Sequence, residues 1–188
     1  MIGELPTSIT LGDVDYPIST DYRVALTIFD ALGDPDLQDK EKAYIMLECL
    51  FDDYTQIPRE YLAEACEKAA LFLDGGVKQK KTNDKPIISW TQDEQLIFAA
   101  VNKVAGREVR AEQYMHWWTF LSLFQEIDDK SLLSTVIQLR QKKNKGKKLE
   151  KWETEFYKAH KDMIDLKRRY SKAELAEREA INRILNGG

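Results

Sequence analysis

The chain has 188 residues, 43% of them hydrophobic and 32% charged, which is typical of a globular protein and too apolar for a disordered one. No stretch approaches the roughly 18 consecutive apolar residues of a membrane span, and the first residues lack the basic and apolar regions of a secretory signal, so we expect neither. Residues 139–172 carry 13 Lys/Arg and 5 Asp/Glu, a net charge of +8, whereas the rest of the chain carries 15 Lys/Arg and 27 Asp/Glu, a net charge of −12. The overall charge of −4 therefore divides into an acidic body and a basic arm. Such a chain can attract a second copy of itself or an acidic partner.

A small hairpin is predicted near the N-terminus. Residues 8–11 and 14–18 are β-prone arms on either side of Gly12-Asp13, and a leading glycine suits a type II′ turn. An isolated hairpin is marginally stable, so this one is expected to pack on helices.

Three helices are predicted to follow the hairpin. The first is capped by Thr20 or Asp21 and runs to Leu32, the second covers residues 40–54, and the third has Pro58 in its first turn and ends at Gly75-Gly76. Apolar residues at three- and four-residue steps predict the inward faces of these helices. They are Tyr22, Ala25, Phe29 and Leu32; Ala43, Met46, Leu47, Leu50, Phe51 and Tyr54; and Leu62, Ala65, Ala69 and Phe72.

The next part of the chain begins with a polar, basic and aperiodic stretch, residues 77–85, which predicts a loop between two helical halves. Thr91 and Glu94 form a predicted capping box for a helix that Gly106 closes. Residues 112–127 are the most apolar segment and are predicted to form a helix at the hub of the core. Ser131 caps the following helix, in which Leu133, Val136, Ile137 and Arg140 share one side.

The C-terminal arm carries a heptad pattern. Seven residues repeat with a spacing of three and four: Leu149, Trp152, Phe156, Ala159, Met163, Leu166 and Tyr170. A strict heptad buries a narrow seam, which predicts either a helical hairpin within the chain or a seam that pairs with another chain. Ser171 and Glu174 form a capping box for a last helix that extends to about Asn186.

These elements predict a mainly α protein: a multi-helix bundle with a small N-terminal β-hairpin and a C-terminal heptad-bearing helical arm. We expect one domain overall, with the arm possible as a separate unit. Its parts are the hairpin and three helices (residues 1–76), a polar loop (77–90), a hydrophobic helical half (91–145) and a basic arm or hairpin (146–188).

No set of residues predicts a catalytic or metal site. His116 lies in the most apolar segment, where a core histidine bonded to a backbone carbonyl is the favoured interpretation, and His160 is expected to be solvated. Cys49 and Cys66 lie on separate helices without a C-x-x-C spacing, which argues against zinc and favours a reducing, cytoplasmic location. We therefore expect no enzyme activity and no cofactor.

Two features are candidates for binding. The lysines at positions 142, 143, 145, 147 and 148 could neutralise phosphates of a nucleic acid, but the acidic body and the lack of a nucleic-acid-binding motif favour a solvated linker. Trp117 and Trp118 are about 100° apart on a helix. Both are expected in the core; the alternative is that one lies in the core and the other meets a second helix layer or a partner.

Five segments together resemble one family. They are Asp21-Tyr22-Arg23, Phe72 to Gly76, Trp90 to Asp93, Met115 to Phe120 with its His-Trp-Trp-x-Phe element, and Val136 to Arg140. Their residues, order and spacing resemble a tailed-bacteriophage family named after gene product fifteen of a temperate phage of Gram-positive bacteria. The resemblance covers residues 10–140, and the arm carries no motif that matches it.

Members of this family are typically encoded just upstream of the tape-measure gene. The resemblance therefore implies a tail-assembly chaperone in the host cytoplasm that binds the tape-measure protein, or other tail proteins, and keeps its long helix soluble. Two alternatives stay open: a structural head–tail or tail component retained in the virion, and a small nucleic-acid-binding protein that uses the Lys-rich segment.

A chaperone of this kind needs an apolar groove or a spare heptad seam for an amphipathic helix. The heptad spacing predicts that the arm contacts a partner helix or a second copy, with Trp152 and Phe156 as anchors. The candidate partner-binding residues are Leu149, Trp152, Phe156, Met163, Leu166 and Trp118, and the basic arm comprises Lys142, Lys143, Lys145, Lys147 and Lys148.

Overall fold

The computed structural model describes residues 3–78 and 85–186, and it confirms the mainly α fold with an N-terminal β-hairpin. Strands β1 (Ser8–Leu11) and β2 (Val14–Pro17) pair antiparallel, with Leu11 opposite Val14 at the turn. Gly12 has a φ of +58° whereas Asp13 does not have a positive φ, which fits the predicted type II′ turn. The hairpin packs on a helix, as expected, because Lys68 donates a hydrogen bond to the carbonyl of Thr10 (2.6 Å) and Leu11 is buried.

Helices α1 (Tyr22–Leu32), α2 (Asp39–Leu50) and α3 (Leu62–Leu73) follow, with short 3-10 turns η1 (Tyr54–Gln56) and η2 (Arg59–Tyr61) before α3. The first helix begins and ends as predicted, at Asp21 and Gly33. The second is shorter than predicted, because Phe51 leaves the helix and forms an isolated β-bridge with Ile18. Tyr54, which was predicted on the apolar stripe of the second helix, therefore lies in η1.

The next group comprises α4 (Glu94–Ala105), the 3-10 turn η3 (Val109–Ala111), α5 (Trp117–Gln125) and α6 (Leu132–Asn144). Gly106, with a φ of +68°, ends α4 as predicted, and Ser131 caps α6 as predicted. The capping box at Thr91 is wrong: α4 begins after Asp93, and the Thr91 hydroxyl donates to Asp30 on α1 (3.0 Å). The helix predicted from residue 112 begins only at Trp117, because the preceding backbone pairs with the start of α1.

The arm differs most from the prediction. The first heptad position, Leu149, precedes α7 (Lys151–Ala159), and the others divide between α7, the short α8 (Lys161–Ile164) and the non-helical residues 165–170. Neither a continuous seam nor a helical hairpin therefore forms. Helix α7 ends at Ala159 because His160 leaves the helical conformation (φ −125°, ψ 30°). Helix α8 ends at Ile164, where the carbonyls of Met163 and Ile164 accept hydrogen bonds from Arg140 on α6 and Ile164 packs in a small buried cluster with Val136 and Leu139. The last helix, α9 (Lys172–Asn186), has the predicted bounds, and Ser171 and Glu174 form the predicted capping box at its start.

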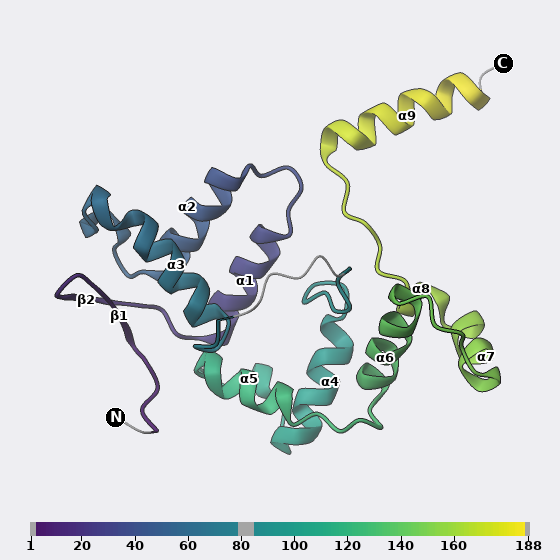
Figure 1. The fold of residues 1–188 in the computed structure, drawn as a ribbon, viewed down its shortest axis with the longest axis horizontal. Helices are drawn as coiled ribbons and strands as arrows, with labels where there is room; N and C mark the ends of the chain where they lie inside the picture. Colours follow the sequence, from purple (N-terminus) through teal and green to yellow (C-terminus); the bar gives the residue numbers. More distant parts are fainter. Residues whose placement is uncertain (1–2, 79–84, 187–188) are drawn as a thin grey trace.

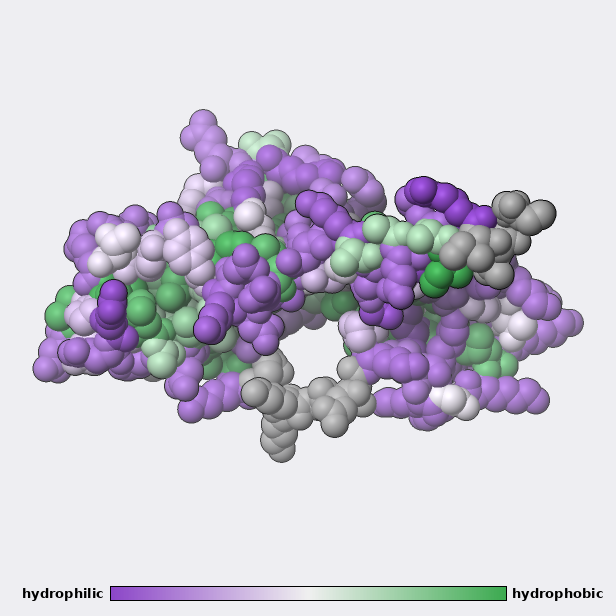
Figure 2. Space-filling model, turned by 90° about the horizontal axis from the view of Figure 1, so that it is seen from above, coloured by the Kyte–Doolittle hydropathy of each residue, from purple (hydrophilic) through white to green (hydrophobic). Residues whose placement is uncertain are grey.

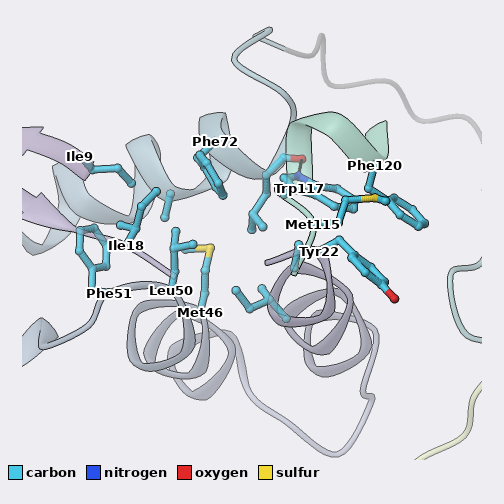
Figure 3. Close-up of a cluster of buried hydrophobic side chains, with 14 of the residues drawn as sticks. Ile9, Ile18, Tyr22, Met46, Leu50, Phe51, Phe72, Met115, Trp117 and Phe120 are labelled. Atoms are coloured by element: carbon cyan, nitrogen blue, oxygen red, sulfur yellow. Dashed lines mark hydrogen bonds between the residues drawn. The ribbon is translucent and has the colours of Figure 1, made fainter. Parts of the chain in front are cut away.

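Figure 1 shows how these elements are arranged. The hairpin and α1–α3 form one end of the molecule, α4 and α5 lie in the middle, α6–α8 form the other end, and α9 projects away from the body. The main core lies between the first two groups. Trp117 and Phe120 of α5 are fully buried there: Phe120 packs on Tyr22 of α1 and Phe98 of α4, and Trp117 reaches the end of α3 (Figure 3). The prediction that this segment is the hub of the core is thereby confirmed.

Residues 79–84 of the predicted polar loop lie outside the described residues, and the proposed division into parts remains a prediction. Within residues 3–78 and 85–186, no helix is long and apolar enough to cross a membrane.

Candidate functional site

The segment before α5 joins α1 through its backbone. The N–H of Tyr22 donates to the carbonyl of Met115 (3.0 Å), and the N–H of Trp117 donates to the carbonyl of Thr20 (2.7 Å). The carboxylate of Asp21 caps α1 by accepting from the N–H of Arg23 (2.9 Å), and it also accepts from the N–H of Met115 (3.2 Å). One short side chain therefore begins α1 and fixes the entry to α5, since carboxylates are favoured N-caps.

His116 has a structural role at this junction. Its ring is 4% exposed, and Nδ1 accepts a hydrogen bond from the N–H of Trp118 (3.0 Å), so that His116 is the N-cap of α5. Its Nε2 lies 3.0 Å from the carbonyl oxygen of Pro6, which can only accept, so Nε2 carries the proton. The prediction of a core histidine bonded to a backbone carbonyl is confirmed, and His160 is exposed at the end of α7 as expected.

The two adjacent tryptophans cap the far end of α3. Trp117 donates its indole N–H to the carbonyl of Leu73 (2.9 Å), and Trp118 donates to the carbonyl of Phe72 (2.9 Å). These carbonyls belong to the last turn of α3, where the helix supplies no further i+4 donor. The carbonyl of Phe72 also accepts from the N–H of Gly75 (3.0 Å). Trp117 is fully buried, whereas Trp118 is half-buried and lies against Phe72 and Gly76, so its ring meets a second helix layer inside this chain.

A buried ion pair links α4 to α6. The guanidinium of Arg140 donates to both carboxylate oxygens of Asp93 (2.6 and 2.8 Å), and both side chains are almost fully buried. Its remaining N–H groups donate to three backbone carbonyls, those of Ile87, Met163 and Ile164. This ion pair was not predicted, although a charged residue in the apolar stripe of Leu133, Val136 and Ile137 was a signal that a buried partner exists.

The segments quoted for the family resemblance therefore contact one another in two buried networks, one at Asp21, His116 and the tryptophans and one at Arg140. A family model described as "Bacteriophage Gp15 protein" matches residues 1–166. The chain belongs to this family. No curated protein and no solved structure matches it.

In this Gp15 family member, the family match includes both buried networks and ends before α9. The networks are made of cap residues, indole N–H groups and an ion pair that is fully used inside the chain. They position helices, so the surfaces available to a partner must be found elsewhere. Among the described residues, no group of three or more His, Cys, Asp or Glu side chains is placed to hold a metal ion. Burial raises the pKa of the Cys49 and Cys66 thiols, which makes both less nucleophilic at neutral pH.

The candidate partner-binding residues of the arm lie in different environments. Trp152 and Met163 are 53% and 36% exposed. Leu149 and Phe156 are half-buried because they pack on the small cluster of α6 and α8. Leu166, also half-buried, lies beyond α8 in the non-helical segment. The structure therefore does not unite the predicted seam, and only Trp152 and Met163 present large exposed apolar surfaces.

The Lys-rich segment is in part bound within the chain. Lys142 and Lys143 belong to the last turn of α6, where Lys142 pairs with the buried carboxylate of Glu153 (2.5 Å) and Lys143 pairs with Asp165. The Lys142 ammonium lowers the pKa of Glu153, because it stabilises the charged carboxylate. Lys145, Lys147 and Lys148 are exposed beyond the helix. The prediction of a linker holds for these three residues and is wrong for the first two, which attach α6 to the arm.

Proposed function

We propose that this bacteriophage protein is a tail-assembly chaperone that binds the tape-measure protein in the host cytoplasm, and that it is a binding protein without enzyme activity. The observation that carries the proposal is α9. This helix projects from the body, and its Leu175 and Ile181 are 47% and 48% exposed (Figure 1). No other helix of the described chain packs extensively against it.

An unpartnered amphipathic helix suits a helical client. Alanines at positions 173, 176 and 180 share one face of α9 with Ile181 at its edge, whereas Leu175 lies on the other side. Figure 2 shows green residues in line along the helix beside purple ones. A client helix can cover such a stripe with its own apolar face, which removes both stripes from water. Trp152 supplies a further exposed aromatic anchor on α7.

The nucleic-acid alternative receives less support from the geometry. A phosphate-binding segment gains affinity by releasing counterions from phosphates through unpaired cations. Lys142 and Lys143 already have carboxylate partners in this chain, which leaves three lysines of the predicted segment for such contacts.

The test is co-expression with the tape-measure protein of the same phage, followed by size-exclusion chromatography with light scattering. We expect a soluble complex that forms only when both proteins are present. Replacing Ala176 and Ile181 together with serine should abolish the complex, whereas Asn182→Ser, on the opposite face of the same helix, should not. If the tape-measure protein stays insoluble and this protein elutes alone, the chaperone proposal is wrong, and detection of the protein in purified virions by mass spectrometry would favour a structural component.

A further inference from the structure

The two ends of the molecule carry opposite charge. Residues 30–67, from the last turns of α1 to the middle of α3, contain 3 Lys/Arg and 11 Asp/Glu, a net charge of −8, whereas residues 139–172 have a net charge of +8. Figure 1 shows α2 and α7, which lie in these two segments, at opposite ends of the molecule. Among the described residues, the ion pairs that join the two segments are those of Arg169 with Asp30 and Asp34. Most of the charge at each end is therefore left for a partner.

The positive end has a groove of about 670 Å³ along α7. Lys148, Lys151 and Lys158 line this groove and are exposed, and none of them forms an ion pair among the described residues. Two carboxylates also line it, but that of Glu150 is already used in the capping box of α7, which leaves Glu155 as a counter-charge. The rest of the lining is uncharged and consists of Leu149 and Thr154. The groove thus offers ammonium groups beside an apolar side chain.

The negative end presents an exposed aromatic pair among carboxylates. Tyr44 is 52% exposed, and its ring meets that of Tyr54 edge-on with the centroids 5.4 Å apart. The Tyr44 hydroxyl, partial burial and the nearby carboxylates of Glu48 and Asp53 raise the pKa of Tyr54 to about 12. Glu48, Asp52 and Asp53 are exposed and form no ion pair among the described residues. The last turn of α2 contains no basic residue, so the partial negative charge of the helix C-terminus adds to that of the carboxylates.

We propose that the groove on α7 of one copy receives the Tyr44–Tyr54 pair of a second copy. The groove lysines then lie beside the Glu48 and Asp52 carboxylates, and a lysine ammonium can also lie over a tyrosine ring, whose face attracts cations. Because the groove and its occupant are different surfaces at opposite ends of the chain, the contact is heterologous and joins copies head to tail.

A second copy fits the groove better than a nucleic acid does. The α2 end supplies both carboxylates for the lysines and an aromatic group for Leu149. Phosphates would supply the charge alone, and the acidic body would repel them. The inference goes beyond the proposed function and does not depend on it, because no client takes part in the contact.

The test reverses the charge at each end of the full chain. One variant carries Lys148→Glu, Lys151→Glu and Lys158→Glu, and the other carries Glu48→Lys and Asp52→Lys, all at exposed positions. Self-association is measured by sedimentation velocity over a range of protein concentrations. We expect the wild type to associate at low salt and to dissociate in about 1 M NaCl, where the screening length is about 3 Å. Each variant alone should associate at least about tenfold more weakly.

A mixture of the two variants tests whether the contact is head to tail. We expect a 1:1 complex, because the first variant keeps its α2 end and the second keeps its groove. General repulsion cannot explain such a result, since the second variant has a net charge of zero instead of −4 and would otherwise associate more readily than the wild type. The control is Lys103→Glu, at an exposed lysine of α4 without an ion pair among the described residues, and it should associate like the wild type.

Three outcomes would overturn the inference. The first is a wild type that stays monomeric at low salt at every concentration. The second is association that persists in both variants, or a mixture of the two variants that stays monomeric. The third is a monomeric wild type that binds a DNA duplex through the three groove lysines, which would assign the groove to phosphates. Failure to bind the tape-measure protein would refute the proposed function and leave this inference standing.

Discussion

Replacing Arg140 with methionine tests how much of the fold depends on one buried guanidinium. Methionine keeps an unbranched apolar side chain in the site and removes five hydrogen bonds, two to Asp93 and three to backbone carbonyls. Asp93, which is 2% exposed, then keeps a buried charge whose remaining side-chain partner is the N–H of Ser89 (2.9 Å). Removing one member of a buried ion pair costs about 3–5 kcal/mol, which corresponds to a fall of about 6–20 °C in Tm for a chain of this size.

Urea unfolding followed by tryptophan fluorescence measures this loss, with Asp93→Asn and the double variant completing the cycle. The double variant carries no unpaired charge, so it should be about 2 kcal/mol more stable than Arg140→Met alone. It should remain less stable than the wild type, because the carbonyls of Ile87, Met163 and Ile164 still lack their donor. A loss below about 1 kcal/mol for Arg140→Met, or a double variant no more stable than that single one, would refute the reasoning.

Three further predictions concern caps, turns and pH. Gly76→Ala should destabilise the protein by about 1–2 kcal/mol or more in urea unfolding, because the residue has a φ of +80° and an added Cβ would lie 3.0 Å from the Trp118 ring. Gly106→Ala is the control: it also has a positive φ, but the space around its Cβ is open, so it should destabilise the protein less. His116→Ala should lower the free energy of unfolding by about 1–3 kcal/mol, because it removes the N-cap of α5 and the hydrogen bond to the Pro6 carbonyl. His116→Asn keeps a cap acceptor and should recover part of this loss. Equal losses for the two variants would contradict the role of His116 as a cap. The Arg110 guanidinium lowers the pKa of Glu108 from 4.5 to about 2, so the stability from this carboxylate is present above pH 4.5 and is lost as the pH falls towards 2. Glu108→Gln should therefore flatten the fall in Tm between these pH values, and an unchanged pH profile would contradict the assignment.

Local signals were sufficient where a single residue type sets the backbone. Ser131 as an N-cap, Gly106 as a left-handed C-terminal residue and the Ser171-Glu174 capping box were predicted at the correct position, and Asp21 is one of the two residues predicted to cap α1. Each depends on hydrogen bonds or φ angles within about four residues, which the sequence pattern contains directly.

The errors arise where a distant residue competes with a local signal. Thr91 has the sequence of an N-cap, but Asp93 is held by Arg140, 47 residues away, and α4 begins after Asp93 instead. The heptad pattern from Leu149 to Tyr170 has the spacing of one long helix, but α7 ends at Ala159 and the short α8 ends at Ile164, where Arg140 binds the carbonyls of Met163 and Ile164. Periodicity shows which residues can share a face, and it carries no information about a guanidinium that binds the backbone at that point.

The same competition explains why the candidate binding surface moved from the predicted seam to α9. Beyond α8 the chain runs along the body: Gln92 exchanges two hydrogen bonds with the backbone of Lys167, and Arg169 pairs with Asp30 on α1. Arg169 lies three residues before the first residue of α9, and three residues span at most about 11 Å, so the start of α9 is held close to α1. The long-range contacts that made the arm unpredictable from its own sequence thus fix the base of the helix that is proposed to bind the client.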